Sequence, residues 1–521
     1  MAKHGIIIGG GHNGLVAACY LAAAGHQITV MEARSIVGGA AVTETFHPGF
    51  RNSTASYTVS LLHPDVIADL NLEQHGLEIL ERRVSNFLPL PDGDYLALYP
   101  DMEATQSEIR RFSKKDALAL PRYYADLDAI VPLLRWAMVQ TPPAGHAGGI
   151  GDLFKVFQLS RQFATLDAAA QRRLLRLFTV SAAEYLDGYF ESAPIKAIFG
   201  FDAVVGHFDS PYAPGSAYVL LHHVVGGVNG KSGTWGHARG GMGAITQAMA
   251  AEARLRQVKI ETDCTVEQVI VEQGRAKGVI VNGERHLADF VVANVNPRLL
   301  YQQLVPDQAQ AQETREHFQH YQCKSGTFRL NVALSQLPSF TAQPNQSVLE
   351  GGIILAPDLN YMARAFEDAR TSGFSKEPIV EMLIPSLVDD SLAPPGQHVA
   401  SLFCQHFDPG LKSQWESLET DAIEAIFDVV EAAAPGFKAS ILAVQSHSPW
   451  ALEQKFGLLG GDIFHGRLSL DQLFSARPML GMGQYQSDID HLYLCGAGTH
   501  PGGGVSGIPG MNAAREIIRR L

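Results

Sequence analysis

The pattern of apolar and polar positions near the N-terminal end predicts a strand, a helix and a second strand, in that order. Residues 5–8 form a short apolar run that is typical of a buried strand. An alanine-rich stretch over about 13–24 predicts a helix, and residues 27–31 form a second apolar, β-branched run. This order is typical of a parallel βαβ unit, so we expect an α/β fold.

The pattern changes along the rest of the chain. Helical periodicity dominates from about residue 105 to 200, and short strand-like runs with glycine turns return between about 259 and 293. From about 300 to 475, runs such as FRLNVAL alternate with helix-like segments, which predicts a mixed sheet with helices. The apolar run LYLC close to the C-terminus predicts one more strand, which has to return to the first sheet.

A chain of 521 residues is too long for one hydrophobic core, so we expect more than one domain. The first is predicted to be a Rossmann-like, discontinuous domain, and the second a mixed-sheet substrate domain with a helical insertion. The predicted boundaries are 1–80, 236–300 and 478–521 for the first domain, 81–235 and 301–477 for the second, and about 105–200 for the insertion.

The turn between the first strand and the first helix has the spacing of a dinucleotide-binding fingerprint, Gly9-x-Gly11-x-x-Gly14. Gly9 permits the tight turn, Gly11 lets the backbone approach a pyrophosphate, and Gly14 allows the helix to pack closely on the strand. Glu32 ends the second strand, where a carboxylate binds ribose hydroxyls and disfavours the 2′-phosphate of NADP. The fingerprint therefore predicts a dinucleotide site.

A second glycine-rich loop follows the C-terminal strand, with seven glycines in the last thirty residues. If that strand lies beside the first one, the loop reaches the far end of the same cofactor. Gly502-x-Gly504-x-x-Gly507 repeats the fingerprint spacing, but only 14 residues follow Gly507. The acidic residue that a dinucleotide site needs about 20 positions later has no place, so no separate NAD site is expected.

Composition narrows the class of protein. The net charge of -13 argues against a nucleic-acid partner, which would require a basic surface. The five cysteines include no C-x-x-C pair, so we expect reduced structural thiols. We expect a cytoplasmic protein with no leader segment before the first strand. The segments LFKVFQLSRQF and RRLLRLF are apolar with basic residues, so each can lie peripherally on an acidic membrane surface or pack as a lid on the core.

Longer motifs resemble the phytoene desaturase superfamily of FAD oxidoreductases. The resemblance runs nearly end to end, through GGGHNGLVAACYLA, SPYAPGSAYVLLHH, GGMGAITQAMA, GLLGGDIFHGRLSLDQLFSARP and LYLCGAGTHPGGGVSG. It implies that the cofactor is FAD, held by the discontinuous FAD-binding domain. The diglycine Gly38-Gly39 after Glu32 resembles the one that follows the ribose acid in FAD-dependent oxidases and desaturases. The positions expected to bind FAD are Gly9, Gly11, Asn13, Gly14, Glu32, Ala33, Arg34, Gly38, Gly39, Ala40, Val266, Gly498, Gly503 and Gly504.

Catalytic side chains are harder to predict. Flavin dehydrogenation chiefly needs the substrate carbon held against flavin N5 in a dry slot, so no side chain is obligatory. Weak candidates are His223 in the pair His222-His223, then His500 and Arg239, and His465 has a similar claim. The alternatives are hydrogen-bonded core histidines and, for Arg239, a surface salt bridge. No metal-ligand spacing is present.

The leading hypothesis is an FAD-dependent oxidoreductase that acts on a small hydrophobic, polyene-like or isoprenoid-like substrate by hydride transfer to or from flavin N5. Two alternatives stay open: an FAD amine oxidase, and a flavin-stabilised binding or assembly protein without turnover. The sequence does not distinguish desaturation from saturation, ketolation or isomerisation, and it leaves the oligomeric state open.

Overall fold

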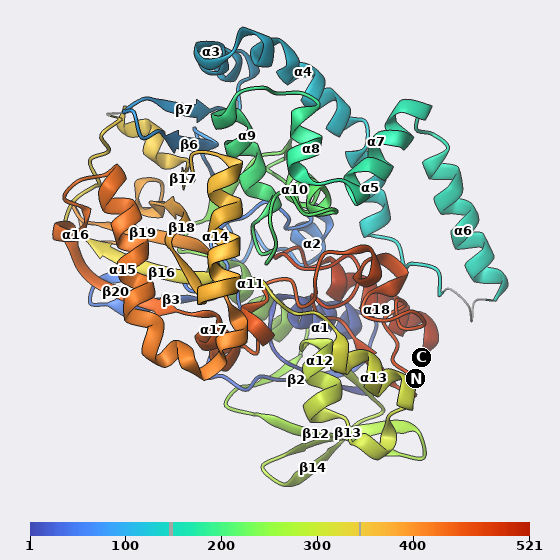
Figure 1. The fold of residues 1–521 in the computed structure, drawn as a ribbon. Coiled ribbons are helices and arrows are strands. Elements are labelled where there is room, and N and C mark those ends of the chain that lie inside the picture. Colours follow the sequence, from blue (N-terminus) through green and yellow to red (C-terminus); the bar gives the residue numbers. More distant parts are fainter. Residues whose placement is uncertain (145–148, 343–344) are drawn as a thin grey trace.

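The computed structural model describes residues 1–144, 149–342 and 345–521. Figure 1 shows a mixed sheet with its helices on the left, a group of helices at the upper right, and the strands of the other sheets below them. The two chain ends lie side by side, where the Nζ of Lys3 donates to the main-chain oxygen of Leu521 over 3.2 Å. The expected α/β fold is confirmed.

The first sheet has five parallel strands in the order β11-β2-β1-β15-β21. Strands from the beginning, the middle and the end of the chain therefore share one sheet, and the C-terminal strand does return to it. The domain boundaries given above stay a prediction. The strands are β1 (His4–Ile8), β2 (Gln27–Met31), β11 (Lys259–Glu261), β15 (Phe290–Ala293) and β21 (Leu492–Leu494).

Helix α1 (His12–Ala23) is the central helix of this sheet and is almost wholly buried. Its small side chains, among them Ala17 and Ala18, allow α11 (Gly243–Leu255) and α18 (Ile508–Arg520) to pack against it. A Cβ at Gly510 of α18 would collide with the carbonyl oxygen of Asn13, so only glycine permits this approach.

The second sheet has seven strands in the order β20-β16-β19-β18-β17-β6-β7. β17 and β6 run parallel and the other pairs antiparallel, so the predicted mixed sheet is confirmed. Trp415 at the start of α15 is fully buried against Phe328 and Phe407. The elements are β6 (Asn86–Pro89), β7 (Tyr95–Leu98), β16 (Phe328–Leu334), β17 (Gly352–Leu355), β18 (Phe374–Leu383), β19 (His398–Phe407), β20 (Ile441–His447), α14 (Leu359–Ser372), α15 (Trp415–Ala433), α16 (Phe437–Ser440) and α17 (Pro449–Phe456).

A helical segment occupies the region where the periodicity is helical. Its core includes an aromatic cluster in which Tyr123 lies 5.2 Å from Phe190 and 5.0 Å from Phe199, measured between ring centroids. The helices are α3 (Met102–Phe112), α4 (Lys114–Asp128), α5 (Val131–Met138), α6 (Ile150–Phe163), α7 (Ala168–Thr179), α8 (Ala182–Asp187), α9 (Ala193–Gly200) and α10 (Ser216–Val224).

Smaller elements connect these layers. An antiparallel three-stranded sheet, β12-β13-β14, packs beside β15 of the first sheet, and β3-β4, β5-β10 and β8-β9 form two-stranded sheets. In the described part of the chain, no helix combines the length and the apolar character needed to cross a membrane. These elements are β12 (Val266–Glu272), β13 (Arg275–Val281), β14 (Glu284–Leu287), β3 (Thr43–His47), β4 (Phe50–Ser53), β5 (Ile79–Glu81), β8 (Gly227–Val228), β9 (Lys231–Ser232), β10 (Gly236–Ala238), α2 (Pro64–Asp69), α12 (Pro297–Leu299) and α13 (Gln312–His320).

Candidate functional site

The fingerprint turn lies between the end of β1 and the start of α1. Gly9 has a φ of +94°, a conformation that strains any other residue. A Cβ at Gly11 would lie 3.0 Å from the Nδ2 of Asn294, which follows β15. The turn thus presents bare backbone and the N-terminus of a helix, and these features favour an anionic group such as a pyrophosphate.

Glu32 is held rigidly at the carboxyl end of β2. Its side chain is only 6% exposed. One carboxylate oxygen accepts a hydrogen bond from the Gly10 amide over 2.7 Å, and the other accepts one from the Arg34 amide over 2.9 Å. The acceptor is therefore oriented by the backbone, beside the cavity described next.

The turn and Glu32 line a cavity of about 460 Å³. Arg34 lies on the same wall, where its guanidinium pairs with Glu44 over 2.5 Å and stacks on the ring of Phe456 at 4.8 Å. The Nη1 of Arg34 is buried and has no hydrogen-bond partner among the described residues. This wall of the cavity therefore combines a fixed acceptor with a cationic donor that still has an open N–H.

The far wall of the cavity is apolar and aromatic. Its side chains come from separate segments of the chain: the loop before β10, strand β19, and the loops around residues 61, 205 and 463. A wall of this kind excludes water and favours a hydrophobic ligand. The apolar residues that form it are Leu61, Val205, Trp235, Phe403, Ile463 and Phe464.

Two adjacent histidines of α10, His222 and His223, also line this cavity. Their rings are nearly perpendicular, with centroids 5.5 Å apart, and His223 stacks on Trp235. The Nδ1 of His223 donates to the carbonyl oxygen of Val219 over 2.8 Å. Burial lowers the pKa of His222 to about 3 and that of His223 to about 4, so both rings are uncharged at neutral pH.

Charged groups near the far wall are screened from the cavity by aromatic rings. Tyr57 lines the cavity and donates its hydroxyl to the carboxyl of Glu381 over 2.5 Å. Phe403 stacks on Tyr57 with centroids 5.0 Å apart, and the guanidinium of Arg329 lies 4.6 Å from the Tyr57 ring centroid. Burial raises the pKa of Tyr57 well above its usual value. A ligand at this end meets aromatic faces instead of ions.

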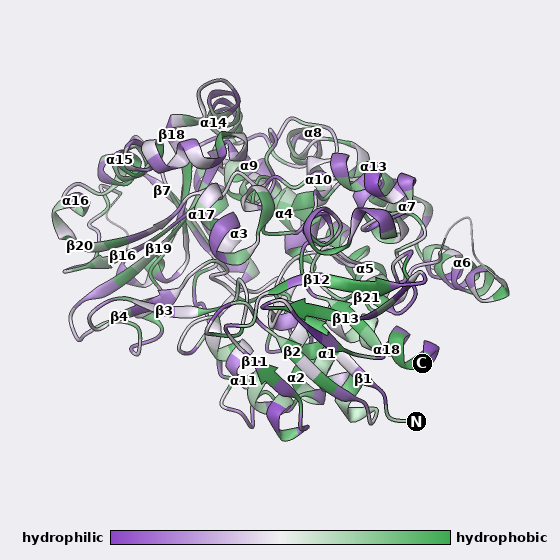
Figure 2. Cartoon of the chain, turned by 90° about the horizontal axis from the view of Figure 1, so that it is seen from below, coloured by the Kyte–Doolittle hydropathy of each residue, from purple (hydrophilic) through white to green (hydrophobic). Residues whose placement is uncertain are grey.

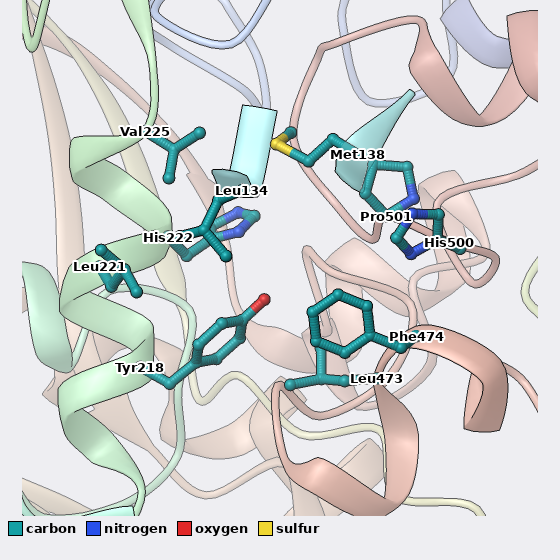
Figure 3. Close-up of a pocket in the computed structure, with 10 residues that line it drawn as sticks. All are labelled: Leu134, Met138, Tyr218, Leu221, His222, Val225, Leu473, Phe474, His500 and Pro501. Atoms are coloured by element: carbon teal, nitrogen blue, oxygen red, sulfur yellow. The ribbon is translucent and has the colours of Figure 1, made fainter. Parts of the chain in front are cut away.

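A side cavity of about 30 Å³ adjoins the far wall (Figure 3). His222 lines both cavities, and Tyr218 and His500 lie on the side cavity only. The Nε2 of His500 donates to the carbonyl oxygen of Ala137 over 2.9 Å. The Nδ1 of His500 and the Nε2 of His222 are buried with no hydrogen-bond partner among the described residues. The volume suits about one water molecule.

Most of the positions predicted to bind FAD lie on the large cavity. The glycines that do not line it serve packing: a Cβ would meet the carbonyl oxygen of Gly9 at position 14, the Oγ1 of Thr246 at position 38, the ring of Pro297 at position 498 and the Cα of Phe464 at position 503. The lining positions are Gly9, Gly11, Asn13, Glu32, Ala33, Arg34, Gly39, Ala40, Val266 and Gly504, and those off the wall are Gly14, Gly38, Gly498 and Gly503.

The predicted catalytic candidates are not brought together. His223 and His465 line the large cavity, but His500 lies on the side cavity because its ring is bonded to the end of α5. Arg239 lies at the surface, with 43% of its side chain exposed, and pairs with Glu78 over 2.5 Å. This is the surface salt bridge weighed above as its alternative.

Several lining residues were not predicted from the sequence. Asn294 follows the apolar strand β15, and a polar residue at the carboxyl end of a parallel strand is a signal that could have identified it. Trp235 and Phe403 carry no such signal, because Trp235 reaches the cavity from the loop before β10 and Phe403 from strand β19 of the second sheet, and only tertiary packing brings them together.

Comparison with known proteins places these observations in a family. The model described as flavin containing amine oxidoreductase matches residues 14–328. The mouse (Mus musculus) pyridine nucleotide-disulfide oxidoreductase domain-containing protein 2 is 40% identical, over 99% of this chain and 93% of its own length.

More distant relatives cover the whole chain. One component of the limonene dehydrogenase of Castellaniella defragrans is 23% identical over 99% of this chain and 94% of its own, and the neurosporene-forming phytoene desaturase of Cereibacter sphaeroides is 22% identical over 100% and 94%. The resemblance to phytoene desaturases is thus confirmed. A solved structure of a putrescine oxidase triple mutant superposes with a TM-score of 0.60 at 15% identity, over 100% of this chain and 99% of that one. At this identity it shows the shared fold.

Proposed function

The chain belongs to the flavin containing amine oxidoreductase family, and on that premise we propose that it transfers hydride between flavin N5 and a hydrophobic, isoprenoid-like molecule. The oxidoreductase class and the cofactor FAD follow from the family. The nature of the substrate and the hydride step are the proposal. Bound FAD supplies the two-electron chemistry.

The residues on the wall formed by the fingerprint turn, Glu32 and Arg34, called the near wall, fit FAD. The bare backbone at Gly9 and Gly11 and the N-terminus of α1 would hold the pyrophosphate. Glu32 would accept hydrogen bonds from the ribose hydroxyls, and the open Nη1 of Arg34 gives this end a donor for an oxygen of the cofactor. Two observations support the fit: a Cβ at Gly9 or Gly11 would fill the space beside the turn, and the buried Nη1 of Arg34 has no hydrogen-bond partner among the described residues.

One observation carries the substrate proposal: the same cavity runs from Glu32 to a wall of aromatic and aliphatic side chains. The walls at Val205, Trp235 and Phe464 exclude water and orient an apolar carbon chain without a charged contact. The uncharged rings of His222 and His223 keep this end free of formal charge. Because its Nδ1 carries a proton toward Val219, His223 keeps a lone pair on its other nitrogen. With a pKa of about 4 this nitrogen is a weak base, so it would accept a hydrogen bond from the substrate and not its proton at neutral pH.

An amine oxidase is the second candidate, and the fold shared with putrescine oxidase is the observation that favours it. Glu32, which lies at the opposite end, is the one carboxylate among the described residues that line the cavity. A cationic amine would therefore find no counter-ion at the far wall, and the apolar substrate is favoured. The limonene and phytoene enzymes among the relatives act, by their names, on isoprenoids, which supports the same choice.

Anaerobic flavin reduction tests the proposal. The purified holoprotein is mixed with carotenoids, retinoids, cyclic monoterpenes, fatty acyl compounds and amines, and the flavin absorbance is followed. We expect bleaching by at least one isoprenoid and none by putrescine or cyclohexylamine. Rapid bleaching by an amine alone would replace the proposal with an amine oxidase. A flavin that no substrate bleaches but that dithionite bleaches would favour a binding or assembly role.

A further inference from the structure

Helix α6 stands at the margin of the molecule in both views (Figures 1 and 2). It begins at Ile150 and ends at Phe163, and none of its 14 residues is buried. Its large apolar side chains are instead among the most exposed of the protein. Their exposed fractions are 89% for Ile150, 70% for Leu153, 60% for Phe154 and 62% for Phe157.

The apolar side chains of this helix face outward and the charged side chains of Asp152 and Lys155 face the protein, which is the reverse of an ordinary surface helix. The exposed apolar residues follow a spacing of three and four and so form one stripe along the outer side. Asp152 points the other way, where one carboxylate oxygen accepts a hydrogen bond from Gln484 over 2.7 Å and the other accepts one from the Ala144 amide over 3.1 Å. Lys155 also faces inward and pairs with Asp152 over 3.3 Å. A helix exposed to water alone would carry the opposite arrangement.

We propose that the outer face of α6 lies in the interface of an anionic phospholipid bilayer. An aromatic and aliphatic stripe on a short helix is the form in which proteins insert into the headgroup boundary without crossing the membrane. Residues 150–180 contain five basic and two acidic side chains in a chain whose net charge is -13. Lys155, Arg173 and Arg176 pair with carboxylates, whereas Arg161 and Arg172 form no salt bridge among the described residues, so these two cations fit an anionic surface. Arg161 is exposed one turn beyond Phe157 on the same stripe, where its guanidinium can reach lipid phosphates.

The size of the stripe disfavours a second copy of this chain as its partner. Four side chains along one short helix offer on the order of a few hundred Å², whereas a stable dimer buries about 800 Å² on each partner. A bilayer sets no such minimum, because insertion and charge attraction add along the helix. The inference concerns where the protein resides and does not depend on the reaction proposed above.

Vesicle flotation with the full-length holoprotein tests the inference. The protein is mixed with vesicles of phosphatidylglycerol or of phosphatidylcholine, and its share in the floating fraction is measured. We expect flotation with phosphatidylglycerol and much less with phosphatidylcholine. The double variant Phe154→Gln with Phe157→Gln should reduce binding about a hundredfold, because two rings no longer insert. Arg161→Gln should weaken binding to phosphatidylglycerol alone.

A matched control uses exposed leucines on other helices. Leu118 of α4 and Leu255 of α11 are 78% and 71% exposed, so Leu118→Gln with Leu255→Gln removes comparable apolar surface elsewhere and should float like the parent protein. Flavin absorbance and melting temperature should be unchanged in all variants. Absence of flotation in the parent protein, or equal flotation of the α6 double variant, would overturn the inference. A dimer in light scattering that the α6 variant abolishes, without flotation, would assign the face to a second copy.

Discussion

The two ends of the cavity are built in different ways. At the fingerprint end, the backbone of Gly9 and Gly11 and the carboxylate of Glu32 come from the first βαβ unit, and Asn294, which follows β15, is added beside them. The far end consists of side chains such as Trp235 and Phe403 from segments that are remote in sequence. A phosphate group binds backbone amides in a fixed geometry, so its site requires a sequence motif. An apolar slot requires only a cavity of the right shape, and many different sequences can provide one.

The largest expected effect comes from distorting the fingerprint turn at the FAD end of the cavity. Gly14→Ala places a Cβ against the carbonyl oxygen of Gly9 and 2.7 Å from the Nδ2 of Asn294, and backbone cannot move aside. We expect FAD affinity to fall by about a hundredfold or more, measured by flavin content after dialysis and by titration of the apoprotein with FAD. Gly151→Ala is the control, because a Cβ there meets nothing within 4 Å. Normal flavin content in Gly14→Ala would contradict the described turn.

The buried histidines of the far end and the side cavity are expected to contribute to the response to acid, together with other buried rings such as His12 and His207, whose pKa values burial also lowers. Burial lowers the pKa of His222 to about 3 and those of His223 and His500 to about 4. Below about pH 6.5 the histidines of the unfolded chain become protonated, whereas the buried rings of the folded protein stay neutral until about pH 3 to 4. The free energy of unfolding therefore falls as the pH falls through this window, by about 3 to 5 kcal/mol for each fully buried ring.

Melting temperatures between pH 7 and pH 4 measure this loss. His222→Gln should flatten the decline, whereas the exposed His320→Gln should leave it unchanged. An identical slope in His222→Gln would show that the ring is not buried and neutral as described.

The contrast between the two ends also explains what could be predicted from the sequence. The strands, the first helix and the positions from Gly9 to Gly39 were predictable because local spacing determines them. His500 was a catalytic candidate from its sequence position in the terminal loop, and the structure bonds its ring to Ala137 of α5, on the side cavity. Phe403 reaches the cavity through pairing of strands far apart in the chain, which no local pattern encodes. For LFKVFQLSRQF the periodicity showed an amphipathic helix, but not which face turns outward.

Removing the ribose acceptor should have an intermediate effect. Glu32→Ala deletes the carboxylate that also holds the Gly10 and Arg34 amides, so we expect FAD binding to weaken by about 1.5 to 3 kcal/mol. Fluorescence titration of the apoprotein with FAD measures it. The exposed Glu284→Gln should bind FAD like the parent protein. Unchanged affinity in Glu32→Ala would remove this residue from the site.

Opening the far wall should have the smallest effect and should spare the cofactor. Trp235→Ala removes a ring that stacks on His223, so we expect full flavin content and about a tenfold loss of affinity for an isoprenoid that reduces the flavin. The concentration dependence of anaerobic flavin reduction gives that affinity. Loss of FAD in this variant would show that the two ends are not separable.

The central claim, that one cavity holds FAD at one end and a hydrophobic molecule at the other, is tested most directly by a flavin difference spectrum. Squalane, a saturated isoprenoid that cannot react in the same way as a polyene, is added to the oxidised holoprotein, and putrescine is added to a second sample. The account predicts a saturable shift of the visible flavin bands with squalane, weakened in Trp235→Ala, and none with putrescine. A saturable shift with putrescine, together with none for squalane or any other isoprenoid, would contradict it.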